Sequence, residues 1–242
     1  MPRPDKIFLS AEWRDLLMLN YEVNPSCLQK YIPAGTELDS FHGKTYVSLV
    51  GFRFCHTKLL GIFPIPLHTE FEEINLRFYV RRSTGGETRR GVVFIAEIVP
   101  KRAIAYTARL FYGENYVHRP MAHRVRTKDS NVEVEYSWRS GNQSSKLRAR
   151  TEGSPSLPME GSLEQFITEH YWGYSRQPNG AAVEYHVSHI PWQVWNATYA
   201  EFSGDTRGLY GNELSQALTK APTSAFIVNG SSVKVFKGSI LL

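Results

Sequence analysis

The stretch that most constrains the fold is residues 91–116, with the sequence GVVFIAEIVPKRAIAYTARLFYGENY. It opens with five consecutive apolar residues, 92–96, most of them β-branched or aromatic. Such a run predicts a strand that is buried on both faces. Pro100 ends this strand, and good helix formers follow it. The stretch therefore predicts a buried strand, a sharp turn that carries Lys101 and Arg102, and a short helix.

Lys101 is the first candidate catalytic residue. The start of a helix is positive, so Lys101 and Arg102 lie at the end that disfavours cations. Burial at the edge of an apolar strand and the charge of Arg102 both favour the neutral amine of Lys101 over its ammonium. A neutral lysine can attack a carbonyl carbon and form a Schiff base. The alternative is a solvated loop lysine, which the spacing alone favours because structural charges are commoner than catalytic ones.

Composition places the chain among folded proteins. Hydrophobic residues make up 42% of its 242 residues and charged residues 21%, which permits a substantial core and argues against disorder. The 13 Tyr, 13 Phe and 5 Trp residues favour a β-rich core. The net charge of +5 is small and spread along the chain. Because no helix-turn-helix, zinc-finger or RNP motif accompanies it, we predict no nucleic-acid partner.

Several other classes of function lack their sequence motifs. The chain opens with no secretory apolar segment and has no apolar run as long as a membrane span, so we expect a cytoplasmic protein with no membrane association. Cys27 and Cys55 belong to no motif, which fits a reducing compartment. The eight histidines show no ligand spacing, and no P-loop, G-x-G-x-x-G or G-x-S-x-G motif is present. We therefore expect no metal and no other cofactor.

Hydrophobic alternation and turn residues predict strands joined by few short helices. The main predicted strands are 16–23, 45–54, 74–80, 92–99, 121–127, 132–139, 146–151, 183–190 and 194–202. A helix is predicted to begin at Asn24-Pro25, and two more cover 162–172 and 213–218. A closing hairpin is predicted over Asn229-Gly230. With no internal repeat and no long linker, residues 1–242 are expected to form a single domain.

Residues 59–67, LLGIFPIPL, are apolar but are interrupted by Gly61, Pro64 and Pro66. The prolines exclude a regular central strand or a helix. Apolar side chains on such a segment still favour burial, so we expect it to line or cover a cavity. A loop that only covers the core is the alternative.

Six segments carry a resemblance to a known family. They are WRDLL at 13–17, PAGTELD at 33–39, EINLRFYV at 73–80, EIVPKRAIA at 97–105, ARLFY at 108–112 and VNGSSVKVFKG at 228–238. The chain resembles the YqjF-like family of uncharacterised bacterial proteins over nearly its whole length, and more distantly the acetoacetate decarboxylase-like proteins. That resemblance implies an α+β, β-rich fold, a mainly antiparallel cone-shaped β-barrel with a few short helices around a hydrophobic pocket.

The resemblance also implies roles for four residues. Pro100-Lys101-Arg102 is similar to the Pro-Lys-Lys turn of the decarboxylases, in which the first lysine forms the Schiff base and its cationic neighbour activates it. Arg14 matches a pocket arginine by spacing and would hold a substrate carboxylate. Glu73 begins a strand similar to the one that begins with a lysine-facing glutamate, and would orient the ligand or move a proton. Arginine replaces the second lysine of the turn here.

A second pocket glutamate of the decarboxylases would fall near Val47 or Ser48 and is absent here. Two functions therefore stay open: a Schiff-base lyase or decarboxylase acting on a small keto acid, and a non-catalytic protein that binds a small apolar or anionic metabolite. In either case the partner is a small molecule. Arg14 and Glu73 are expected to form an ion pair without ligand, because neither charge is easily buried alone.

Overall fold

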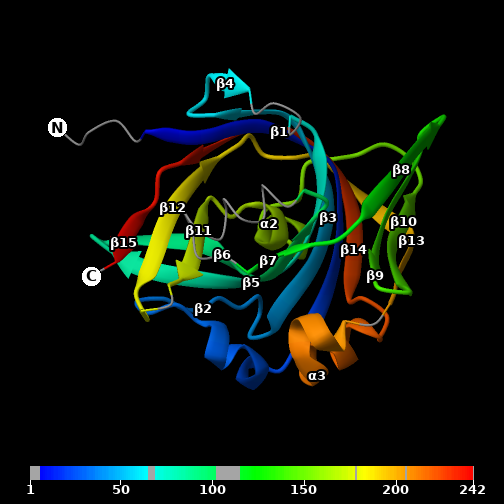
Figure 1. The fold of residues 1–242 in the computed structure, drawn as a ribbon. Helices are drawn as coiled ribbons and strands as arrows, with labels where there is room; N and C mark the ends of the chain where they lie inside the picture. Colours follow the sequence, from blue (N-terminus) through cyan, green and yellow to red (C-terminus); the bar gives the residue numbers. More distant parts are fainter. Residues whose placement is uncertain (1–5, 65–68, 102–114, 178, 205, 242) are drawn as a thin grey trace.

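The computed structural model describes residues 6–64, 69–101, 115–177, 179–204 and 206–241. Strands dominate it, with a few short helices, as predicted. Within the described residues the strands form one mixed sheet in the order β15-β12-β11-β6-β5-β3-β1-β14-β13-β10-β9-β8. The ribbon in Figure 1 shows how this sheet curls into a ring with an extension on one side.

A closed barrel is the centre of the fold (Figure 1). Its strands, in order around the ring, are β12 (Ala182–Ser188), β11 (Trp172–Arg176), β6 (Glu87–Val99), β5 (Phe71–Thr84), β3 (Thr45–Leu59), β1 (Ile7–Val23) and β14 (Ser224–Phe236). The ring closes where β12 pairs with β14, at Val187 opposite Val235. Neighbouring strands are antiparallel except β11 and β6, which are parallel.

The sheet continues past β14 as an antiparallel extension, here called the wing. The wing consists of β13 (Val194–Ser203), β10 (Gln143–Thr151), β9 (Asn131–Ser140) and β8 (Met121–Lys128). Four short strands border the barrel: β2 (Glu37–Leu38), β4 (Phe63–Pro64), β7 (Tyr116–His118) and β15 (Ser239–Leu241). The helices are η1 (Pro25–Tyr31), α2 (Leu163–Thr168) and α3 (Arg207–Leu218), and α2 lies across the middle of the ring in Figure 1.

Apolar side chains fill both faces of the barrel wall. Along β3, Val50, Phe52 and Phe54 point into the barrel, whereas Val47 and Leu49 belong to a second cluster that includes the wing. This alternation follows from the two-residue period of a strand. On β6, Val92 and Phe94 pack with the inner cluster and Val93 and Ile95 with the outer one. The prediction of a strand buried on both faces is therefore confirmed.

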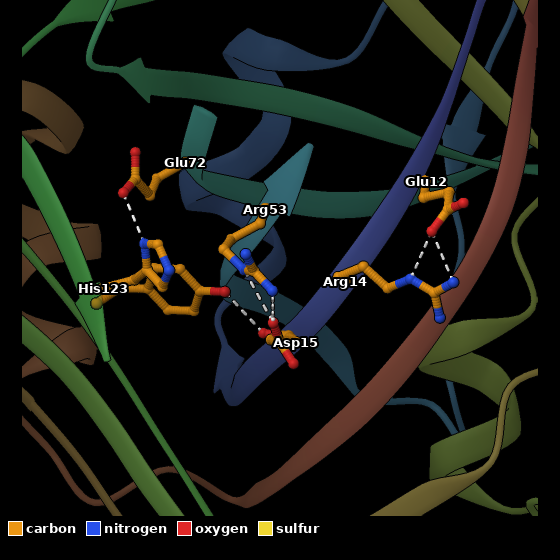
Figure 2. Close-up of polar contacts among 7 residues, drawn as sticks. Glu12, Arg14, Asp15, Arg53, Glu72 and His123 are labelled. Atoms are coloured by element: carbon orange, nitrogen blue, oxygen red, sulfur yellow. Dashed lines mark hydrogen bonds and ion pairs between the residues drawn. The ribbon is translucent and has the colours of Figure 1, made fainter. Parts of the chain in front are cut away.

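Polar contacts also join the barrel strands to one another and to the wing, as Figure 2 shows. The guanidinium of Arg53 donates two hydrogen bonds to Asp15, at 2.6 and 2.9 Å. His123 of the wing lies 2.7 Å from the carboxylate of Glu72 on β5. The buried hydroxyl of Tyr136 donates to the main-chain carbonyl of Asp15, at 2.9 Å.

Three local predictions need correction. The hairpin over Asn229-Gly230 is wrong: β14 runs on through both residues and bends at Gly230, whose φ is 83°. The opposite strand β1 bends at the same level, at Asp15, whose φ is 55°. The positive φ angles of Asp15 and Gly230 therefore belong to a bend shared by two paired strands and not to a hairpin turn. Helix α2 ends at Thr168 rather than at residue 172, because residue 172 begins β11.

Helix α3 begins at Arg207, six residues before the predicted start at 213. The helix predicted after Pro100, and Arg102 with it, lie outside the described residues. No helix among the described segments is long and apolar enough to cross a membrane.

Candidate functional site

A cavity of about 320 Å³ occupies the inside of the barrel. Every strand of the ring contributes side chains to its wall, and most of them are apolar. Many of them are aromatic, among them Trp13, Phe52, Phe54, Phe71, Phe94 and Trp192. An apolar cavity with a few convergent polar groups is the usual form of a small-molecule site.

Two buried carboxylates face this cavity. Glu73, Asn75 and Arg77 all line it, because alternate residues of β5 point to the same side of the sheet. Glu97 of β6 stands opposite Asn75 in the ladder and lines it too. The residues Glu73 and Glu97 are only 3% and 1% exposed.

Neighbouring polar groups fix Glu73 in place. The side-chain amide of Asn75 donates to its Oε1 at 3.1 Å, and the hydroxyl of Tyr116 donates to its Oε2 at 3.3 Å. Tyr116 belongs to β7, which pairs with the end of β6 beside Glu97. The carboxylates, the tyrosine and the end of β6 therefore form one polar end of the cavity, here called the acidic end.

Arg77 lies at a different level of the cavity. It is four residues beyond Glu73 on β5, which separates their Cα atoms by roughly 13 Å at the rise of a strand, and two residues beyond Asn75, which stands opposite Glu97. Its Nη2 donates to the main-chain carbonyl of Ile167 at 3.0 Å, and the guanidinium lies 5.7 Å from the Tyr79 ring centre. This second polar end is here called the basic end.

His170 lines the cavity at the basic end and contacts the same Tyr79 ring, at 4.7 Å between ring centres. Burial, together with the Arg77 and Arg90 cations, lowers the pKa of His170 to about 4 against the opposing effect of Asp39. The ring is therefore neutral at pH 7. Its Nε2 lies 3.9 Å from Asp39 Oδ2, too far for a hydrogen bond.

Asp39 behind this ring is held as a carboxylate. Burial alone would raise its pKa, but hydrogen bonding and the charge of Arg90 outweigh burial and hold the pKa at about 2. Arg90 donates to both carboxylate oxygens, at 2.7 and 3.2 Å. A hydrogen bond from His170 would also lower the pKa of Asp39. Because His170 Nε2 is 3.9 Å from Asp39 Oδ2, we attribute the low pKa mainly to Arg90.

A family model described as DUF2071, an uncharacterized conserved protein, matches residues 10–232. The chain belongs to the DUF2071 family. It is 27% identical over 207 residues to the uncharacterized protein YqjF of Bacillus subtilis strain 168, a match that covers 84% of this chain and 81% of that protein. The expected YqjF-like family is thereby confirmed.

Solved structures support the fold of this DUF2071 member. Acetoacetate decarboxylase from Legionella pneumophila superposes with a TM-score of 0.67 at 14% identity, covering 100% of this chain and 92% of that one. An acetoacetate decarboxylase-like enzyme from Sphingomonas wittichii RW1 gives 0.68 at 13%, covering 97% and 93%. The enduracididine biosynthesis enzyme MppR complexed with pyruvate gives 0.66 at 15%, covering 100% and 92%. At such identities the likeness shows the fold alone, and the predicted acetoacetate decarboxylase-like fold is confirmed.

Of the predicted site residues of this DUF2071 chain, only Glu73 faces the cavity among those described. Lys101 directly follows Pro100 at the end of β6; it is half-buried and is not among the described residues that line the cavity. Because Ile98 pairs with Ile74, the chain beyond Val99 runs past the level of Glu73 and away from Arg77, which puts Lys101 on the acidic side of the cavity. Arg102 lies outside the described residues.

The predicted ion pair between Arg14 and Glu73 is wrong. Arg14 donates two hydrogen bonds to Glu12, at 2.7 and 2.9 Å, and its side chain is 41% exposed (Figure 2). The reason is strand alternation: Trp13 points into the cavity, so its neighbours on β1, Glu12 and Arg14, point outward and meet each other.

The segment 59–67 lines the cavity less than predicted. Leu59 contributes to the cavity wall, but Leu60, Ile62 and Phe63 are 55%, 68% and 58% exposed. Phe63–Pro64 forms β4, which pairs back on the end of β3 and projects at the rim of the barrel (Figure 1). Residues 65–67 lie outside the described part of the chain.

Sequence reasoning missed Asn75, Arg77, Glu97 and His170. The first two were detectable, because polar residues at every second position of the apolar strand 73–80 mark a polar face turned inward. His170 had no such pattern, since it follows a helix and reaches the cavity only through the packing of α2 across the barrel.

Proposed function

We propose that the cavity binds a small keto acid and that Lys101 forms a Schiff base with its keto group. The observation that carries this proposal is the acidic end: two nearly fully buried carboxylates, Glu73 and Glu97, face an apolar cavity beside the strand that leads to Lys101. Buried acids in such surroundings are typical of proton-transfer sites. MppR, which shares this fold, has been solved in complex with pyruvate, and this supports a small keto acid as the ligand by analogy of fold.

The chemistry begins with the neutral amine of Lys101, which Arg102 would favour by its like charge. The amine attacks the keto carbon, a C–N bond forms, and the carbonyl oxygen leaves as water after taking up two protons. The iminium then withdraws electrons from the adjacent carbon. Glu73 would take a proton from that carbon and leave an enamine, or, where a carboxylate is attached there, its C–C bond would break with release of carbon dioxide.

A non-catalytic binding protein is the second candidate. The position of Lys101 favours it, because this lysine is half-buried and outside the set of described residues that line the cavity. In that case the cavity would hold a small apolar or anionic metabolite without covalent chemistry.

Borohydride trapping separates the two candidates. The wild-type protein is incubated with pyruvate, acetoacetate and 7-oxooctanoate in turn, reduced with borohydride and digested for peptide mass spectrometry. At least one keto acid is expected to give a stable secondary amine on Lys101. Lys101→Arg is expected to abolish the adduct while it keeps the native circular-dichroism spectrum and melting temperature.

Lys220, in an exposed turn after α3, provides the matched control. Lys220→Arg removes a lysine far along the chain from the acidic end and is expected to leave the labelling of Lys101 unchanged. If ligand binding is measurable for the wild type but no lysine is trapped, the Schiff-base mechanism is wrong and the binding protein remains.

A further inference from the structure

Arg77 lacks the acidic partner that comparable arginines have. Arg53 pairs with Asp15, and Arg90 pairs with Asp39. Among the described residues no carboxylate pairs with Arg77; its guanidinium contacts the Ile167 carbonyl and, at 3.8 Å, the sulfur of Met18. Arg77 is half-buried, a guanidinium stays charged in proteins, and a charge partly removed from water without a counter-ion is costly.

Three nitrogen atoms at the basic end have no hydrogen-bond partner among the described residues. The Nε of Arg77 is buried and has no hydrogen-bond partner, and neither ring nitrogen of His170 has one. The side chain of His170 is only 2% exposed and lines the cavity. Buried polar groups are normally satisfied, so unmet donors that face a cavity point to a ligand.

We propose that Arg77 and His170 form a carboxylate-binding site at the basic end of the cavity, and that the ligand is an extended apolar monocarboxylate. Arg77 supplies the counter-charge through its free Nε and the remaining hydrogens of its guanidinium, as arginine does for carboxylates. The neutral ring of His170 donates one N–H. The apolar body of the ligand packs against the apolar and aromatic side chains that line the cavity.

The length of the ligand follows from the spacing of the two ends. Lys101 lies past the level of Glu73, because Ile98 pairs with Ile74, and Glu73 is four residues from Arg77 on β5, roughly 13 Å between Cα atoms. In pyruvate the carboxylate and keto carbons are bonded to each other, so one molecule cannot serve both ends. A chain of about six to eight carbons, with its carbonyl remote from its carboxylate, suits this spacing and a cavity of about 320 Å³.

This assignment rests on the proposed function only in treating the cavity as the ligand site, and it changes the reaction expected there. A carboxylate remote from the carbonyl cannot leave as carbon dioxide from the Schiff base. The iminium would instead lose a proton from the carbon next to it to Glu73, giving an enamine that can take up a proton or attack an aldehyde. We therefore infer enamine chemistry rather than decarboxylation.

Binding of octanoate and of its neutral amide, octanamide, tests the site without any carbonyl that could react with Lys101. Isothermal titration is performed on the wild type and on Arg77→Met, which keeps much of the length of the side chain and removes its charge. Arg77→Met is expected to weaken octanoate at least tenfold and to leave octanamide within about threefold, because a charged hydrogen bond alone is worth a tenfold change or more. Arg148→Met, which breaks a wing pair with Glu133, is the control and leaves both affinities unchanged.

Stability of the unliganded protein gives a second readout. Arg77→Met is expected to leave the melting temperature unchanged or to raise it, because it removes a charge that has no acidic partner among the described residues. Arg53→Met is expected to lower it, because Asp15 is left without its ion-pair partner. Equal loss of octanoate and octanamide in Arg77→Met, or no binding of octanoate by the wild type, would overturn the inference. Octanoate binding that depends on Arg77, with no trapping of Lys101, would keep the site and reject only the Schiff base.

Discussion

Gly230→Ala is expected to lower the free energy of unfolding by about 4 kcal/mol. Gly230 has a φ of 83°, a conformation that disfavours any side chain, and a Cβ there would overlap the carbonyl oxygen of Trp13 and lie 2.7 Å from Leu16 Cδ1. The obstacle is main chain on the paired strand β1, which cannot move without breaking the bend that β1 and β14 share. Chemical denaturation followed by tryptophan fluorescence measures the loss.

Gly43→Ala separates the two causes. Gly43 has nearly the same φ, 78°, but a Cβ added there would meet no atom within 4 Å. Only the conformational cost then remains, and we expect a loss of about 1 kcal/mol. If the two variants lose equal stability, the close approach of β1 and β14 is not what holds the bend.

His170 is expected to make the protein sensitive to acid between pH 6.5 and pH 4. In the folded state burial lowers the pKa of His170 to about 4, against 6.5 for the free side chain. Between these values the unfolded chain binds a proton that the folded protein does not, so stability falls as the pH falls, by up to about 3 kcal/mol. Above pH 6.5 both states are neutral, and this contribution no longer changes with pH.

His170→Phe removes the titrating ring and retains an aromatic side chain beside Tyr79 and Phe166. Its unfolding free energy is expected to change less than that of the wild type between pH 6.5 and pH 4.5, and a parallel series at pH 8 measures the packing cost separately. Asp39 does not affect the comparison between pH 6.5 and pH 4.5. Its pKa is held at about 2, so its contribution to the free energy of unfolding is lost only at lower pH. Identical slopes for variant and wild type would mean that folding leaves the pKa of His170 unshifted.

The sequence predicted much of the fold because strand periodicity is a local property. The residues of β6 are apolar without interruption from 92 to 96, and both faces of that strand are buried in the structure. The bend at Gly230 was mistaken for a turn, since an Asn-Gly pair suits both and only the pairing of β14 with β1 distinguishes them. Closure of the barrel between β12 and β14 likewise depends on contacts distant in sequence.

The candidate site was predicted less completely, for a similar reason. Glu73 was placed correctly in the cavity, because its strand resembles one that begins with a pocket glutamate. Arg14 was matched by spacing alone, and one residue of register decides whether a strand side chain points inward or outward. On β1 the inward position belongs to Trp13, and the arginine that lines the cavity is Arg77 of β5. His170 reaches the cavity through tertiary packing that no local pattern shows.

A single ligand that joins the acidic and basic ends of the cavity would be visible directly. The deciding measurement is a crystal structure of the wild-type protein reduced with borohydride in the presence of 7-oxooctanoate. We predict continuous density from Lys101 Nζ through the cavity to a carboxylate that accepts hydrogen bonds from Arg77. Density that begins at another lysine, or a carboxylate bound away from Arg77, would contradict this arrangement.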